Sequence, residues 1–167
     1  MKKILMLSLA LFLGGCILQS ETPNFSEANG KPLLGKAGGS YLAYSLDKGV
    51  WTVEDKPVSL LAVGKHYEFS EKGKTTEITS IPISGEWWIA QFQEGKEAAV
   101  YVLADKQTDA IYIHTLGCDD LKKLSWSKTH VTFVKDDCFL AAHTKAEAFK
   151  DLIGVAGPRT MKLVLQN

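Results

Sequence analysis

Arginine is nearly absent from this chain of 167 residues: Arg159 is the only one, and lysine supplies the rest of the positive charge. The 19 basic side chains are balanced by 19 acidic ones, so the formal net charge at pH 7 is zero. Without a basic excess, the protein has no overall field that would gather nucleic acid. A single arginine also leaves little scope for forked recognition of phosphate. The composition therefore predicts no nucleic-acid partner.

The chain also lacks the short motifs that mark common catalytic and nucleotide-binding sites. It contains no GxSxG, HExxH, P-loop or GxGxxG sequence. Two S-x-x-K matches, Ser45–Lys48 and Ser125–Lys128, are close to the number that chance gives in a chain rich in both residues. His114 with Asp119 and Asp120 is the best cluster for acid–base work, but a structural histidine at a strand end explains it equally well. We predict neither an enzyme nor a cofactor.

No apolar run is long enough to span a bilayer as a helix. The longest, Ile4–Leu13, has ten residues, whereas a span of about 30 Å needs about 20. The run follows Lys2 and Lys3 and precedes two glycines. A charged start, a short apolar stretch and small residues after it are typical of a secretory signal peptide.

The residues Leu13, Gly14, Gly15 and Cys16 resemble the lipobox of bacterial lipoproteins. The resemblance implies that Cys16 receives a diacylglyceryl group on its sulfur, that the peptide before it is removed, and that the new amino terminus is acylated, with palmitate as a typical chain. Several acyl chains hold a protein on a membrane far more firmly than one. Because Ile17 stands where aspartate would retain the protein at the inner membrane, the resemblance implies the outer membrane, facing the periplasm.

These features divide the chain into three parts. Residues 1–15 are the predicted signal peptide. Residues 16–39 are the predicted lipidated cysteine and a flexible tether, because proline, glycine, serine and asparagine are dense there and no period persists. Residues 40–167 are predicted to form one globular, β-rich domain, since 46% of the chain is apolar and its length suits a single core.

From residue 40 onward, short runs of Val, Ile, Tyr, Trp, Phe and Thr alternate with turn signals. The pattern predicts strands near 40–46, 50–54, 57–63, 66–70, 75–83, 86–92, 97–104 and 109–115. Strands at this spacing favour an antiparallel meander. Pro57 and Pro82 suit a strand start and an edge or bulge respectively, because proline cannot donate a hydrogen bond to a sheet.

Some of these strands are apolar on both faces. Val100 and Val102 share one face of their strand, while Tyr101 and Leu103 share the other. Such strands are usually covered on both sides. A curled sheet or partial barrel, with a helix laid over part of it, would provide that cover.

The last third of the chain has a different pattern, with a short helical turn near 119–124 and strands near 130–134, 139–142 and 161–165. Thr144 and Glu147 have the spacing of a capping box. Apolar residues at helical spacing follow, and Gly154 is placed to end the helix. The expected fold is thus mostly β (α+β), with one capped helix near the C-terminus followed by a last strand.

Cys118 and Cys138 remain once Cys16 carries lipid. In an exported domain an isolated pair of cysteines usually forms a disulfide. In the chain-entropy model, closing a loop of about 21 residues contributes about 3 kcal/mol. The alternative is a metal site, with His114 four residues before Cys118 and further histidines nearby in the sequence. We predict the disulfide and no metal, because exported thiols tend to oxidise first.

The tryptophans are the remaining candidates for contact with a ligand or partner. Trp87 and Trp88 are adjacent on a predicted strand and must point to opposite faces, so one can pack in the core while the other is exposed. Trp126 is the third candidate. Packing in the core or at its rim is the simpler interpretation for all three.

Two functional hypotheses from different classes follow. The first is a lipid-anchored module of the cell envelope that binds a protein partner, and it predicts an exposed aromatic or apolar patch around one of the tryptophans. The second is a carrier that holds a small apolar ligand inside a curled sheet or barrel, as lipocalin-like lipoproteins do. Small barrels are often filled by their own side chains, which counts against the carrier.

Overall fold

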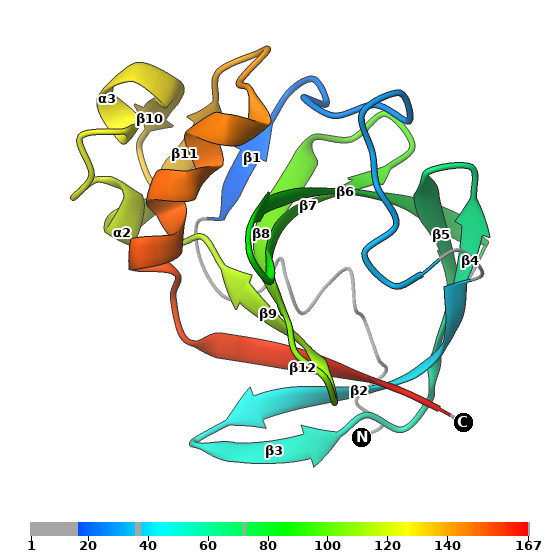
Figure 1. Ribbon diagram of the computed structural model, residues 1–167. Coiled ribbons are helices and arrows are strands. Elements are labelled where there is room, and N and C mark those ends of the chain that lie inside the picture. The colour runs from blue at the N-terminus through cyan, green and yellow to red at the C-terminus, as the bar shows by residue number, and fades with distance from the viewer. Residues whose placement is uncertain (1–16, 36–37, 72, 167) are drawn as a thin grey trace.

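The computed structural model describes residues 17–35, 38–71 and 73–166. The predicted signal peptide and the predicted lipidation site, Cys16, lie outside these residues. Within them, twelve strands form one sheet, and eight of the strands close into an antiparallel barrel (Figure 1). The barrel strands are β2 (Gly38–Asp47), β4 (Val58–Val63), β5 (His66–Glu71), β6 (Lys74–Ser84), β7 (Trp87–Glu94), β8 (Ala99–Lys106), β9 (Ile111–Thr115) and β12 (Arg159–Leu165).

The barrel is a meander closed by the last strand of the chain. From β4 to β9, each barrel strand pairs with the next one along the chain. β12 then lies between β9 and β2 and pairs antiparallel with both. The sheet is therefore closed rather than a curled sheet or partial barrel. The prediction of a mostly β fold is confirmed, and its strand positions agree with the observed ones to within two residues.

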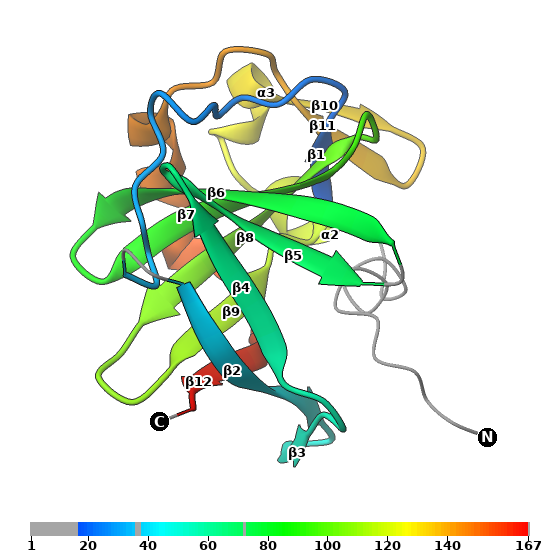
Figure 2. The ribbon, with the colours of Figure 1, turned by 90° about the vertical axis from the view of Figure 1, so that its right-hand side faces the viewer.

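The other strands lie outside the barrel wall. β3 (Val50–Val53) pairs with the second half of β2 as an added edge strand. β1 (Leu18–Ser20) pairs with β8 and β11 (Asp137–Leu140), and β11 pairs with β10 (Val131–Val134). Figure 2 shows β1, β10 and β11 beside the barrel together with α2 (Cys118–Leu121) and α3 (Ser127–His130).

Two hydrophobic cores lie on the two sides of one barrel wall, and strand β8 contributes to both. Val102 and Ala104 face the barrel interior. Tyr101 and Leu103 face the outer core, beneath β1, β11 and the helices. Seven consecutive residues of β8 are buried, which explains why the sequence is apolar on both faces of this strand.

The prolines take the positions expected of a residue without an N–H group. Pro57 directly precedes β4. Pro82 lies at the register shift between β6 and β7. Neither position requires a donor to the ladder.

Residues 17–35 are not a tether, which corrects the boundary predicted from composition. Ile17 forms a bridge with Gly117, and Leu18 and Phe25 have exposed fractions of 0% and 4%. Leu33 is buried in the barrel core. The segment is rich in linker residues, but its few apolar side chains pack against two cores that become recognisable only in the folded barrel.

A buried hydroxyl group fixes this N-terminal segment to the barrel. Tyr101 donates from its Oη to Gln91 Oε1 at 3.0 Å and accepts from the backbone N–H of Asn24 at 3.0 Å. Ser20 Oγ lies 2.8 Å from the same Oη. Gln91 also binds both backbone polar groups of Phe25. These bonds satisfy polar groups that would otherwise be costly to bury.

The C-terminal helix differs from the prediction. It is η1 (Ala146–Val155), a 3-10 helix, and its N-cap residue is Lys145, which makes no side-chain capping bond. The capping box does not form, because the Thr144 hydroxyl donates to Ala141 O at 2.7 Å. Phe149 and Leu152 are fully buried against the outer core, as the spacing of the apolar residues predicted. The fold also has α2 and α3, so the helical content is not confined to one capped element.

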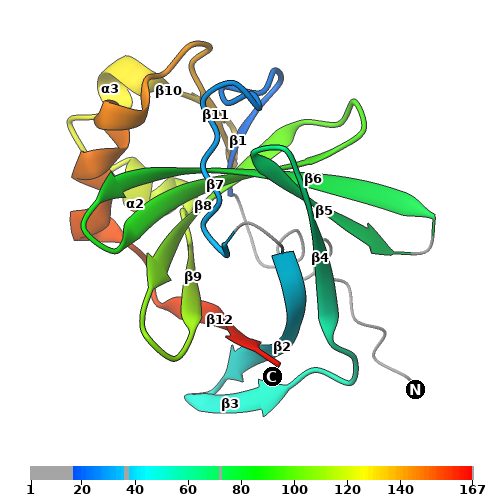
Figure 3. The ribbon, with the colours of Figure 1, turned by 45° about the vertical axis from the view of Figure 1, so that its right-hand side comes forward.

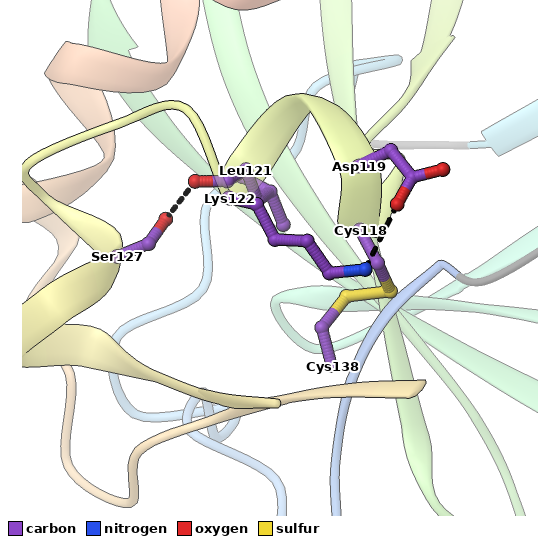
Figure 4. The surroundings of a disulfide bond; sticks show 6 residues. All are labelled: Cys118, Asp119, Leu121, Lys122, Ser127 and Cys138. Carbon is purple, nitrogen blue, oxygen red and sulfur yellow. Dashed lines mark hydrogen bonds and ion pairs between the residues drawn. A yellow bond between two sulfur atoms is a disulfide. The ribbon is translucent and has the colours of Figure 1, made fainter. Parts of the chain in front are cut away.

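The predicted disulfide is confirmed. Cys118 in α2 is bonded to Cys138 in β11, with the two Cα atoms 5.5 Å apart (Figure 4). Nearby, Ser127 Oγ at the start of α3 donates to Leu121 O of α2 at 2.6 Å. The disulfide therefore joins the helical connection to the strand pair β10–β11, on the outer side of the barrel.

Reduction of the disulfide should destabilise this outer layer without opening the barrel. We expect dithiothreitol to lower the free energy of unfolding by about 3 kcal/mol, which lowers Tm by about 6–12 °C in a chain of this size. Calorimetry measures the change. The matched control is C118A/C138A, which should start at the lower Tm and not respond to the reductant. A wild-type Tm that dithiothreitol leaves unchanged contradicts the expectation.

Candidate functional site

The structure places the three predicted contact tryptophans in packing positions. Trp126 has an exposed fraction of 6%, and its ring lies 5.9 Å from that of Phe149. Trp87 and Trp88 are both half-buried and pack on opposite faces of β7, against the outer and barrel cores respectively. The alternation along the strand is confirmed. For Trp126 a contact role is corrected, because the helical layer covers its ring.

An aromatic face forms instead around Trp51, on the outer side of the barrel. Tyr44 pairs with Val53 and with Lys162, and Lys162 pairs with Tyr112. Register partners on neighbouring strands share a face, so four strands contribute side chains to one surface. We call this surface the Trp51 face: Tyr44, Trp51, Val53, Tyr112 and Lys162.

Two cations lie over the rings of the Trp51 face. Lys162 Nζ is 4.6 Å from the Tyr44 ring centre and 5.1 Å from that of Trp51. The Arg159 guanidinium carbon is 3.9 Å from the Tyr112 ring centre. Attraction between a cation and an aromatic face contributes about 0.5–1 kcal/mol at exposed sites. It holds the lysine amine on the surface in a defined place.

The two cations differ in their charge partners. Arg159 Nη2 donates to the buried Asp105 at 3.1 Å, so its charge is balanced within the protein. Within the part of the chain that the structure describes, no carboxylate lies within ion-pair distance of Lys162. The Trp51 face thus presents one unbalanced positive charge among aromatic rings.

The hairpin that carries Trp51 also exposes aliphatic side chains. Val50 and Val53 have exposed fractions of 65% and 49%. In the described residues β3 pairs only with β2, so its second edge has free backbone groups. Exposed edges of this kind are sites where other chains bind. Sequence reasoning missed the site because Tyr112 of β9 and Lys162 of β12 join the β2–β3 hairpin only after the barrel has closed.

A second candidate site lies inside the barrel. The interior is filled mainly by aliphatic side chains, but a cavity of about 40 Å³ remains between residues that include Ile78, Ala90 and Met161. One water molecule needs about 10–15 Å³. The cavity therefore has room for a few small molecules the size of water, and none for a lipid.

The cavity is closed on one side by the segment Lys31–Gly35, which we call the strap. Figure 3 shows the chain that leads from β1 to β2 crossing the barrel opening. Leu33 and Leu34 of the strap line the cavity. Tyr67 Oη accepts from Leu34 N at 3.0 Å and donates to Gly35 O at 2.7 Å.

The histidine considered for acid–base work has a structural environment. The imidazole of His114 is 7% exposed, its Nδ1 lies 2.7 Å from Gly157 O, and its ring is 5.0 Å from that of Trp87. Asp119 and Asp120 form ion pairs with Lys122 and Lys123 instead. Among the described residues, no group of three or more His, Cys, Asp and Glu side chains has the geometry of a metal site.

Comparison with protein family models, with curated proteins and with solved structures found no match for this chain. No helix in the described ranges is long and apolar enough to cross a membrane.

The tyrosines at the strap predict a loss of stability in alkali. Burial raises the pKa of Tyr41 and of Tyr67 above the usual 10.0. Below pH 10 both phenols are protonated in the folded and unfolded chains. As the pH rises through 10 the unfolded chain ionises first, so the free energy of unfolding should fall.

Urea denaturation between pH 8 and pH 11 measures this effect. Y41F/Y67F should show a shallower fall than the wild type, and the lysines, which also titrate in this range, are common to both proteins. The comparison at pH 8 is the control, because both phenols are neutral there. Parallel curves for the two proteins contradict the expected role of burial.

Proposed function

We propose that this chain is a lipid-anchored protein of the cell envelope whose barrel is a non-catalytic module for binding another protein. The observation that carries the proposal is the Trp51 face, with an unbalanced lysine held over two rings. The sequence hypothesis requires an exposed aromatic or apolar patch around one of the tryptophans. Trp51 is half-buried and lies beside the exposed Val53, whereas Trp126 is buried.

The chemistry of the Trp51 face suggests the kind of partner. Tyrosine, tryptophan and arginine are the residues most enriched where binding energy concentrates, and they surround one unpaired amine. A partner surface that brings a carboxylate to Lys162 and an apolar side chain to Val53 would complement it.

The anchor is proposed from the lipobox resemblance at Cys16. Ile17 already belongs to the folded domain through its bridge with Gly117, and neighbouring Cα atoms are about 3.8 Å apart. A lipidated Cys16 would therefore hold the domain directly against the membrane rather than on a tether. We propose the periplasmic face of the outer membrane as its location.

A carrier of a small apolar ligand is the second candidate function. The closed barrel and its apolar cavity favour it. The small volume of that cavity ranks it below the binding module, because the strap must move before the barrel can hold a larger ligand.

The binding module is tested by photo-cross-linking in intact cells. A cross-linking residue at position 53 should give an adduct of defined mass, whereas one at Leu61 should give none. Leu61 is the matched control because its exposed fraction, 62%, is at least as large as that of Val53. Equal adducts at both positions, or none at either, contradict the proposal.

Charge reversal at Lys162 tests whether the partner brings a carboxylate to the Trp51 face. Lys162→Glu should reduce the yield of the position-53 adduct by about tenfold, equivalent to about 1.4 kcal/mol of binding. Lys74→Glu, at the first residue of β6 and away from the Trp51 face, is the control and should leave the yield unchanged. An adduct that survives K162E at full yield contradicts a carboxylate partner.

The anchor predicts a change of compartment. Cys16→Ser should move the protein from the membrane fraction to the soluble fraction and remove the acyl mass from the mature chain. Mass spectrometry of the intact protein measures the lipid directly. Wild-type protein whose mass shows no acyl groups contradicts lipidation. The binding role of the Trp51 face is tested separately, by the cross-link at position 53.

A further inference from the structure

A second hollow lies next to the apolar cavity, on the outer side of the strap. That hollow has a volume of about 140 Å³ and is bordered by the β8–β9 turn and by Tyr41. Leu33, Leu34, Ile111 and Leu163 line both spaces. The leucines of the strap therefore border both hollows, and moving the strap aside would join the two into one space.

Hydroxyl groups at the barrel opening bind the strap rather than the barrel. Ser80 Oγ donates to Lys31 O at 2.8 Å, and Lys31 N donates back to Ser80 O at 2.8 Å. Tyr67 binds the backbone of Leu34 and Gly35, and Tyr41 Oη donates to Leu34 O at 3.4 Å. If the strap leaves, all three hydroxyls lose their partners at the mouth of an apolar space.

We infer that this space takes up the acyl chain of a single-chain amphiphile, and that Leu33 and Leu34 occupy the place of that chain in the ligand-free protein. The inference rests on the second proposed function, the carrier. In the bound state the strap moves aside, and the chain replaces the contacts of the two leucines with the aliphatic wall.

The head of the ligand is expected to accept hydrogen bonds. The phenols of Tyr41 and Tyr67 and the hydroxyl of Ser80 would donate to it in place of the strap carbonyls. Buried donors left without partners are costly, so a ligand that lacks an acceptor at this position should bind poorly. Lys106 and Asp109, which carry opposite charges, both border the outer hollow. Either a carboxylate or an ester head could accept hydrogen bonds from the three hydroxyl groups.

The interior also limits the size of the chain. Eight-stranded barrels are just wide enough to be filled by side chains or to hold one small ligand. Ala90 lines the inner cavity with an exposed fraction of 2%. Its small side chain leaves the space that a larger residue would fill, which makes it the natural position for blocking the site.

The test is a titration with the fluorescent fatty acid cis-parinarate, using the exported chain with Cys16→Ser so that no detergent is needed. We expect saturable binding of one probe per protein. Ala90→Leu and Ala90→Trp should weaken binding by at least about tenfold because they fill the cavity. L33A/L34A should strengthen it by about tenfold, since the competing leucines are gone.

Control and displacement experiments give each outcome a meaning. L61A removes a leucine from the outer face of β4 and should not change binding. Displacement by oleate or by mono-oleoylglycerol shows whether the head is a carboxylate or an ester. Circular dichroism shows whether each variant is folded. If A90W does not fold, A90L is used as the blocking variant.

Two results would overturn the inference in different ways. If A90L abolishes binding but L33A/L34A leaves it unchanged, the carrier function stands and the strap inference fails. If neither the wild type nor L33A/L34A binds the probe, or if A90L binds it as well as the wild type, both fail.

Discussion

Burial of strand β8 on both faces is the constraint on which the rest of the structure depends. The strand supplies one wall of the barrel and also the floor of the outer core. An antiparallel strand that is apolar on both faces must be covered twice. Closure of the barrel covers the inner face. The outer face recruits β1, β11 and η1, and the disulfide then holds that layer in place.

The same constraint explains why residues 17–35 are part of the domain. Tyr101 and Gln91 face the outer core and bind each other there, but their polar ends need further partners that the barrel does not supply. The backbone of Asn24 and Phe25 supplies those partners, which leads the chain toward the barrel opening. The strap therefore lies across the opening because the preceding residues are held in place by the hydrogen bonds of the outer core. The Trp51 face lies on barrel strands that this layer leaves uncovered, where β3 adds an edge.

Local patterns were enough to predict the strands and the disulfide. Alternation predicted the opposite orientations of Trp87 and Trp88, and the positions of Pro57 and Pro82 were predicted from the missing N–H group alone. The failures occurred where a local pattern competed with a distant partner. Thr144 has the sequence of a capping residue, but its hydroxyl binds Ala141 O. Residues 17–35 have the composition of a linker, but their apolar side chains are buried by strands far along the chain.

The sequence by itself determined the β-rich class, the strand positions and the pairing of Cys118 with Cys138, because periodicity and residue chemistry are local properties. Closure of the barrel was decided only by the tertiary structure, because β12 joins β2 and β9 across most of the chain length. Both candidate sites depend on that closure. The Trp51 face collects side chains from β2, β3, β9 and β12, and the cavity is lined by residues of β4, β5, β6, β7, β9 and β12. No local pattern could place these residues together, since their proximity follows from pairing between distant segments.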